Sequence, residues 1–349
     1  MDFIKATIFI IFLSPVVYMS HLYPEGGWDA WTVWNFKSKT LLLGSENWQN
    51  IFDPVLWRTS PHYPLFLPFI NVWGWSFTKN APQITPILTS IIFSIMLIGL
   101  LFSTIKELVR TDSYLIPVIS VLSLPVFIKL STSQYSDLLV GFYLLAIFYC
   151  LIIVKLKNCK NIALLAGIFI GFLSFTKSEG FVTSAIILLL FLPFIFFKNT
   201  IKDRKQVITY FFLAAAISLI PAIIFKVFYA PENLTFINGL ISAKHPASFE
   251  RLQAILFFYC IEPVTFKWNG FWIVLFLSML LSLKKCFDSN FIIIPCFLFI
   301  YFLILTAYYL TNTHFAIAWW LKNTLTRILF SVLPSIVLWV NLCVFDKQE

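Results

Sequence analysis

Long apolar stretches, separated by short polar segments, run along the whole chain. Ile84–Ile105 and Phe181–Phe197, for example, contain no charged residue. Runs of about 20 apolar residues are long enough to cross a bilayer, where a helix satisfies its own backbone groups. The pattern therefore predicts an all-α integral membrane protein of about ten spans. The candidates are 3–22, 84–105, 113–131, 138–154, 161–176, 180–197, 207–228, 267–283, 290–310 and 326–345.

The composition supports this class. Of 349 residues, 60% are hydrophobic and 12% are charged, whereas a soluble domain has about 25% charged residues. The net charge of +9 could suggest a nucleic-acid partner, but the basic residues lie in short clusters between apolar runs, as the positive-inside rule describes. We therefore expect no nucleic acid, and cytoplasmic positions for Lys106/Arg110, Lys155/Lys157/Lys160, Lys198/Lys202/Arg204/Lys205 and Lys284/Lys285.

These assignments give a single polytopic domain, 1–349, with both termini cytoplasmic. The composition, rich in Phe, Ile, Lys and Asn, favours a bacterial inner membrane. Residues 23–83 form a large first outer, periplasmic loop, which holds seven of the twelve tryptophans. Within it, Tyr63–Phe77 is apolar but short and rich in proline and tryptophan, so we expect it to dip into the outer leaflet without crossing.

The first outer loop begins with the sequence GGWDAWTVWNFKSK, residues 26–39. At helical spacing Thr32, Asn35 and Lys39 form a polar strip, and Trp31 and Trp34 face the other way, which predicts an amphipathic helix lying in the membrane interface. Asp29 falls in its first turn, where the helix dipole favours a carboxylate. This residue could take a proton from an acceptor hydroxyl, or it could simply cap the helix.

Two further polar groups mark outer connections between spans. Asp137 ends the sequence Gln134–Asp137, where it could be functional, because a carboxylate at a membrane boundary is costly unless paired, or it could cap the next helix. Lys177 and Glu179 stand in a very short turn, where they could merely neutralise each other.

Basic residues at the same face need a reason, because the positive-inside rule disfavours them there. Arg58 and His62 open the dipping segment, and Lys322 and Arg327 enter the last span. Arg327 lies about one turn inside an apolar helix, so it could bind a carboxylate or phosphate, or it could extend toward the headgroups. The convergence of these groups on one face suggests a site for a sugar and a phosphate.

The order of these elements resembles the GT-C superfamily of polytopic glycosyltransferases, and within it the protein mannosyltransferases and the aminoarabinose transferase of lipid A. That family has an acidic residue after the first helix, matched here by Asp29, and an HPPL-like segment, matched loosely by His62–Leu65. A second Asp opens a later span, matched by Asp137. Bacterial members carry a TKxEG turn, matched by Thr176–Gly180, and an Arg entering a late span, similar to Arg327. One proline of the usual pair is missing at 62–64, and the large C-terminal soluble domain of some relatives is absent.

The resemblance implies inverting transfer of a sugar from a polyprenyl-phosphate donor to a lipid, glycan or protein acceptor at the periplasmic face. Asp29 would orient or deprotonate the acceptor hydroxyl, and cations would stabilise the departing phosphate. No metal or other cofactor is required, although a divalent cation between Asp29 and Asp137 stays possible. The candidate catalytic residues are Asp29 and Asp137, and the candidate substrate-binding residues are Arg327, Arg58, His62, Lys177, Glu179, Lys322 and Trp34.

Three other functions use the same features. A transporter or flippase for lipid-linked sugars needs the same apolar spans, but transport sites lie near the midplane, and most spans here have no ionisable residue inside. A polysaccharide polymerase or ligase would place its cations in a large late outer loop, whereas the large loop here is the first. A structural subunit would have no chemistry of its own.

Overall fold

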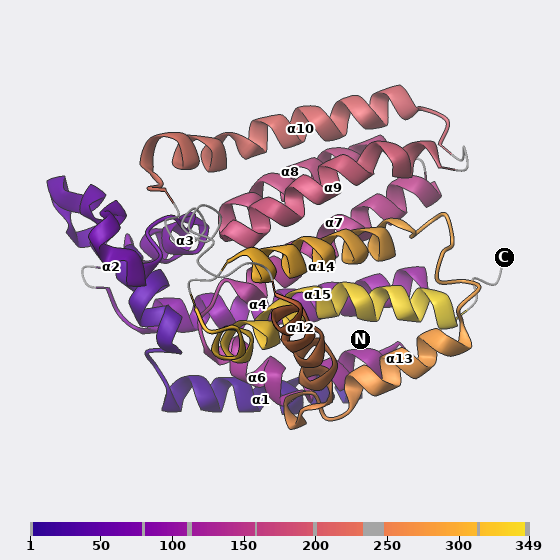
Figure 1. The fold of residues 1–349 in the computed structure, drawn as a ribbon, viewed down its shortest axis with the longest axis horizontal. Helices are drawn as coiled ribbons and strands as arrows, with labels where there is room; N and C mark the ends of the chain where they lie inside the picture. Colours follow the sequence, from indigo (N-terminus) through magenta and orange to yellow (C-terminus); the bar gives the residue numbers. More distant parts are fainter. Residues whose placement is uncertain are drawn as a thin grey trace.

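The computed structural model describes residues 3–78, 81–109, 114–157, 159–197, 201–232, 248–312 and 315–345. Arg110 and Lys198, two of the basic residues expected at the cytoplasmic face, lie outside this part of the chain. Within it the chain is helical, as the apolar pattern predicts (Figure 1). In chain order the α-helices are α1 (Phe3–Leu22), α2 (Asn35–Leu43), α3 (Phe66–Trp75), α4 (Ile84–Leu108), α5 (Leu115–Leu122), α6 (Pro125–Thr132), α7 (Asp137–Lys157), α8 (Lys160–Thr176), α9 (Ser178–Phe196), α10 (Arg204–Ile224), α12 (Phe249–Ile261), α13 (Phe271–Leu281), α14 (Ile293–Thr311) and α15 (Ile317–Val344).

Six helices in the described part are long and apolar enough to cross a membrane: α4, α7, α9, α10 with its continuation to Tyr229, α14 and α15. The pair α5 and α6 would add a seventh span, but it is bent by 62°. The bend lies where Pro125 opens α6, because proline lacks the N–H that a continuous helix needs and holds Leu124 in an extended conformation. The other three candidate spans form the shorter apolar helices Phe9–Leu22, Lys160–Thr176 and Phe271–Leu281. A multi-pass membrane protein is therefore supported, whereas the number ten stays a prediction.

The expected dipping segment forms α3, a helix of ten residues. At about 1.5 Å per residue it is roughly 15 Å long, half the thickness of the hydrocarbon core. It contacts α2, α4 and α8 at one end of the bundle, on the left in Figure 1. The helix α12 was not among the expected elements, and it packs against α14 and α15.

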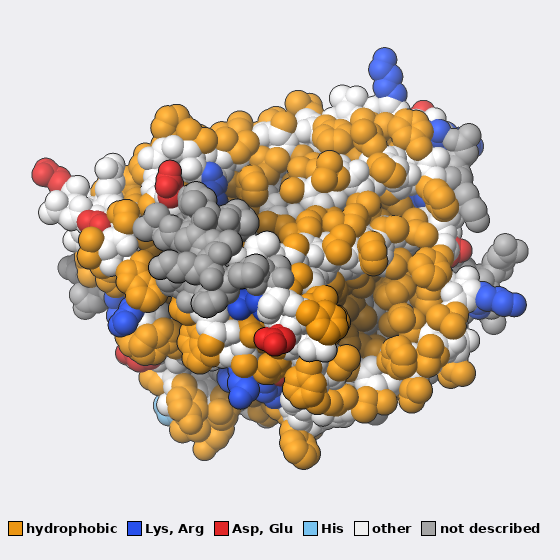
Figure 2. Space-filling model, viewed as in Figure 1, with side chains coloured by type: hydrophobic (Ala, Val, Ile, Leu, Met, Phe, Trp, Pro, Cys, Tyr) orange, Lys and Arg blue, Asp and Glu red, His pale blue; other side chains and the backbone are white. Residues whose placement is uncertain are grey.

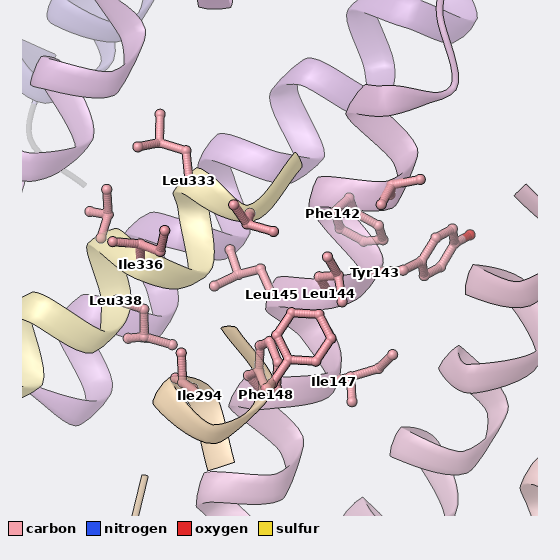
Figure 3. Close-up of a cluster of buried hydrophobic side chains, with 14 of the residues drawn as sticks. Phe142, Tyr143, Leu144, Leu145, Ile147, Phe148, Ile294, Leu333, Ile336 and Leu338 are labelled. Carbon is pink, nitrogen blue, oxygen red and sulfur yellow. The ribbon is translucent and has the colours of Figure 1, made fainter. Parts of the chain in front are cut away.

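The core is built around α7, which is buried along nearly its whole length between α4, α8 and α15. Side chains such as Leu145 and Phe148 of α7 point toward Leu333 and Ile336 of α15 and toward Ile294 of α14 (Figure 3). Close helix packing on the other side uses small residues, since the backbone of Gly171 in α8 lies directly against Ser218 of α10.

Four of the predicted cytoplasmic clusters meet at the opposite end of the bundle from α2 and α3. Lys157 at the end of α7 pairs with Glu107 at the end of α4. Lys155 donates to the Ser289 carbonyl before α14, and Lys160 at the start of α8 donates to Gln206 near the start of α10. Figure 2 shows the corresponding surface, with hydrophobic side chains over the middle and charged ones toward the two ends. The sequence-based grouping of the basic loops at one end is thus supported within these residues.

Candidate functional site

Arg327 of α15 joins two distant carboxylates at the α2 and α3 end of the bundle. Its Nη1 donates to Oδ2 of Asp29 at 2.6 Å. Its Nε donates to Oδ2 of Asp137 at 2.9 Å, and Nη2 lies 2.8 Å from the same oxygen. The planar guanidinium suits this arrangement, because its donors point in fixed directions toward two acceptors at once. Three candidate residues therefore form one cluster.

Lys177 extends the cluster. Its Nζ lies 3.0 Å from Oδ1 of Asp137 and 2.7 Å from Oε2 of Glu179. Burial alone would lower the pKa of this ammonium group, but the carboxylates of Asp137 and Glu179 outweigh it and raise the pKa above its usual value. The turn that presents Lys177 is tight because Gly180 packs against the backbone carbonyl of Leu173, where a Cβ would collide. Asp29, Asp137, Glu179, Lys177 and Arg327 form what we call the charge cluster, with three carboxylates against two cations.

Tyr135 contacts the charge cluster and links Arg327 to the segment that carries Asp29. The Arg327 guanidinium is 4.4 Å from the centre of the Tyr135 ring, a cation–π contact. The backbone N–H of Asp29 donates to the Tyr135 hydroxyl at 3.4 Å. Burial, followed by the Asp29 charge, raises the pKa of Tyr135, so the hydroxyl stays protonated at neutral pH. A Cβ at Gly27 would lie 2.3 Å from this hydroxyl oxygen, so only glycine fits there.

Amide side chains hold the segment that carries Asp29. Gln134 has a left-handed backbone, with φ of 57°, at the turn between α6 and α7. Its Oε1 accepts from Asn35 at 2.8 Å, and its Nε2 donates to the Pro24 carbonyl at 2.9 Å. Asn71 of α3 in turn donates to Asn35 at 3.2 Å. The segment before α2 is thereby fixed against the start of α7 by buried hydrogen bonds, which are costly to break.

Asp29 is the more accessible of the two aspartates. Its side chain is 24% exposed, compared with 2% for Asp137. It precedes the π-helical turn η1 (Ala30–Trp34) without forming a side-chain cap, so the capping alternative does not describe it. Within the described residues only Oδ2 of Asp29 has a hydrogen-bond partner, and Oδ1 is left to accept from another molecule.

The other predicted binding residues lie outside the charge cluster. Arg58 and Lys322 are exposed, and Arg58 packs over the Trp57 ring. Trp34 is fully buried and stacks on Tyr63 at 5.6 Å, so in this conformation its ring is not open to a sugar. Trp31 is 48% exposed, hence the expectation that Trp31 and Trp34 share a face is wrong. The buried face of this segment holds Val33, Trp34 and Lys37 at helical spacing, and Trp31 lies outside that face.

His62 lies beside Tyr63, and two lysines surround this segment. Lys37 is fully buried, and its Nζ donates to the carbonyls of Ser60 and Tyr63 at 2.7 and 3.0 Å. Lys226, which follows α10, donates to the His62 carbonyl at 2.9 Å. Burial and then the charges of Lys226 and Lys37 lower the pKa of His62 to about 3, so its imidazole is neutral at neutral pH.

Sequence reasoning assigned no role to Lys37, Lys226 or Tyr135. A signal for Lys37 exists, because it follows Val33 by four residues and so falls on the buried face of the helix. Among the described residues no group of three His, Cys, Asp or Glu side chains is suited to a metal ion, and the six cysteines are free thiols. The charge cluster offers Asp29 as a base, whereas Lys37 and Lys226 offer positive charge toward an anion.

Comparisons of the chain with protein-family models, with curated proteins and with solved structures give no match.

Proposed function

We propose that the chain is a membrane glycosyltransferase that moves a sugar from a polyprenyl-phosphate donor to a hydroxyl-bearing acceptor at the periplasmic face. One observation carries the proposal: a partly exposed carboxylate, Asp29, is held by Arg327 at one end of an apolar helix bundle, with one oxygen unpartnered among the described residues. A base positioned beside the membrane surface is what transfer from a lipid-linked donor requires, because the sugar is at the interface while the tail stays in the bilayer.

In this mechanism Oδ1 of Asp29 accepts the proton of the acceptor hydroxyl as the hydroxyl oxygen attacks the anomeric carbon. The bond between that carbon and the phosphate oxygen breaks, and polyprenyl phosphate leaves with the bonding electrons. Attack opposite to the leaving group inverts the anomeric configuration. Phosphate is a good leaving group, so the residues must supply a positioned base and positive charge near the phosphate.

The contacts of Arg327 favour a positioning role over direct phosphate binding. Its guanidinium is engaged by Asp29 and Asp137, and the charge cluster holds more carboxylates than cations. A phosphate would be repelled by that excess of negative charge unless it displaced a carboxylate. Arg327 therefore orients Asp29, as Asp137 and Lys177 orient Arg327, and the phosphate needs other cations.

The test uses the purified full chain with polyprenyl-phosphate sugars and measures release of polyprenyl phosphate together with transfer of the sugar. Asp29→Asn should abolish both while the protein still inserts and keeps its apparent Tm within a few degrees. Asp53→Asn is the matched control, because Asp53 is an exposed aspartate of the same loop whose side chain accepts from the Val55 N–H. Wild-type turnover by Asp29→Asn would remove Asp29 from the mechanism. Movement of intact donor across vesicles without release would favour a flippase.

A further inference from the structure

An apolar groove of about 470 Å³ lies between α3, α8 and α10, within the volume range of small-molecule sites. Phe66 and Ile70 line it from α3, Phe172 and Phe175 from α8, and Pro221 from α10. The lining is aromatic and aliphatic, and these helices belong to the apolar part of the bundle, so the groove suits a hydrocarbon chain.

Two lysines that have no acidic partner among the described residues lie next to one end of this groove. Phe175, which lines it, packs against Phe225, and Lys226 follows directly. Lys226 follows Pro221 by five positions, roughly 7 to 8 Å along the helix axis. Lys37 contacts the segment that runs into α3, three residues before Phe66. Lys226 therefore follows a helix that lines the groove, and Lys37 of α2 contacts the segment that leads into another.

The charges of these lysines are uncompensated. Within the described residues Lys37 and Lys226 form no ion pair, and their hydrogen bonds go to the backbone carbonyls of residues 60, 62 and 63. Lys226 uses one of its three N–H donors on the His62 carbonyl and is only partly buried. Burial and the charge of Lys226 lower the pKa of Lys37, as expected for two cations that lack an anion. A ligand with negative charge would stabilise both in their ionised forms.

We propose that this groove binds the tail of an isoprenoid lipid monophosphate and that Lys226, with Lys37 buried behind it, holds the phosphate. The proposal rests on the function proposed above, since it places the phosphate of the lipid-linked substrate, and it assigns to Lys226 and Lys37 the positive charge that the charge cluster does not offer. Shape selects the apolar chain, and the paired ammonium groups select an anionic phosphate over a neutral headgroup.

The test measures binding of farnesyl phosphate, farnesol, inorganic phosphate and phosphatidylglycerol to the purified full chain in detergent. Farnesyl phosphate should bind best. Lys226→Met should weaken the binding of farnesyl phosphate by at least about tenfold, because a charge-assisted contact is lost. The affinity for farnesol should stay unchanged. Ile70→Trp, which fills the groove, should weaken the binding of both farnesyl phosphate and farnesol. Lys39→Met is the matched control, because Lys39 is an exposed lysine of the same helix as Lys37.

Other results would overturn the proposal. Equal affinities of Lys226→Met and Lys39→Met for farnesyl phosphate would mean that Lys226 only fixes the 60–63 backbone, and Lys226→Gln repeats the comparison if the methionine variant does not fold. Phosphatidylglycerol binding as tightly as farnesyl phosphate would indicate a site for bulk lipid. Asp29→Asn separates the two proposals: it should bind farnesyl phosphate normally whether or not it transfers sugar, so transfer can fail while this site stands.

Discussion

Arg327 donates from Nη1 to Oδ2 of Asp29 at 2.6 Å, across a separation of 298 residues in the chain. The contact connects the segment after α1 to the last long helix, and no short-range feature of either segment requires it. An arginine inside an apolar helix is costly unless it is paired, and a loop carboxylate is mobile unless it is held. Asp29 therefore provides the partner that Arg327 needs inside the helix, and Arg327 holds the Asp29 carboxylate in place.

This contact should be measurable as an interaction free energy. Asp29→Asn and Arg327→Gln each remove it, so the double variant should be more stable than the sum of the single losses predicts, by about 1 kcal/mol. The measurement is chemical unfolding in detergent of the wild type, both single variants and the double variant. Additive losses would show that the pair contributes nothing in the lipid or detergent environment.

The two aspartates should differ in their contribution to stability. Asp137 is 2% exposed and pairs with Arg327 and Lys177, so Asp137→Asn leaves two cations with less compensation in a buried place. A broken buried pair costs about 3 kcal/mol or more, whereas Asp29 is 24% exposed and solvent can replace part of its contact. Asp137→Asn should therefore lower the apparent Tm clearly more than Asp29→Asn does. Equal shifts would contradict the burial difference.

Even an alanine side chain at position 27 should disturb the structure. A Cβ there lies 2.3 Å from the Tyr135 hydroxyl oxygen, so Gly27→Ala must displace the ring or the loop that carries Asp29. Transfer should fall, and the apparent Tm should fall with it. In a Tyr135→Ala background the collision is gone, so the same glycine substitution should cost less there. Gly99→Ala is the control, because nothing lies within 4 Å of its Cβ position in α4.

The sequence predicts the all-helical class and which polar segments lie at the same end of the bundle, because both depend on repeated, local patterns. Apolar runs identify the long helices, and the short basic clusters collect at one end. The convergence of Asp29, Asp137 and Arg327 at the other end was also expected, since each stands at the outer boundary of a candidate span.

The sequence could not show which residues contact one another across long separations in the chain. The pattern left a carboxylate or a phosphate open as the partner of Arg327, and it could not show that two carboxylates from distant segments bind it. Trp31 and Trp34 were expected to share one face, but Trp34 lies on the buried face with Val33 and Lys37, whereas Trp31 is exposed. A lysine such as Lys37 is expected at the surface. Its burial is possible because the segment 60–63 folds over it and supplies two backbone carbonyls as hydrogen-bond acceptors.

The direction of the chain across the membrane is testable from the two ends. Lys39 is exposed at the α2 end, and Lys285 lies at the end where the basic clusters meet. Single cysteines at these positions, in a chain whose native cysteines are replaced, should react differently with an impermeant thiol reagent added to intact cells: position 39 should be labelled and position 285 protected until the membrane is opened. Labelling in the reverse order would place the charge cluster in the cytoplasm.

His62 should make stability depend on pH in the acid range. Its pKa in the folded protein is about 3, because of burial and the charges of Lys226 and Lys37, whereas an unfolded histidine titrates near 6.5. As the pH falls below about 6.5 the unfolded chain binds a proton that the folded chain does not, so the contribution of this group to stability is complete above that pH and declines toward pH 3, by up to about 1.4 kcal/mol for each pH unit. His62→Asn removes this linkage and should flatten the fall of apparent Tm between pH 7 and pH 4, while His21→Asn, at an exposed position, should leave the slope unchanged. An identical slope in the wild type and in His62→Asn would show that His62 is protonated in the folded state and that the two lysines do not act on it as their positions require.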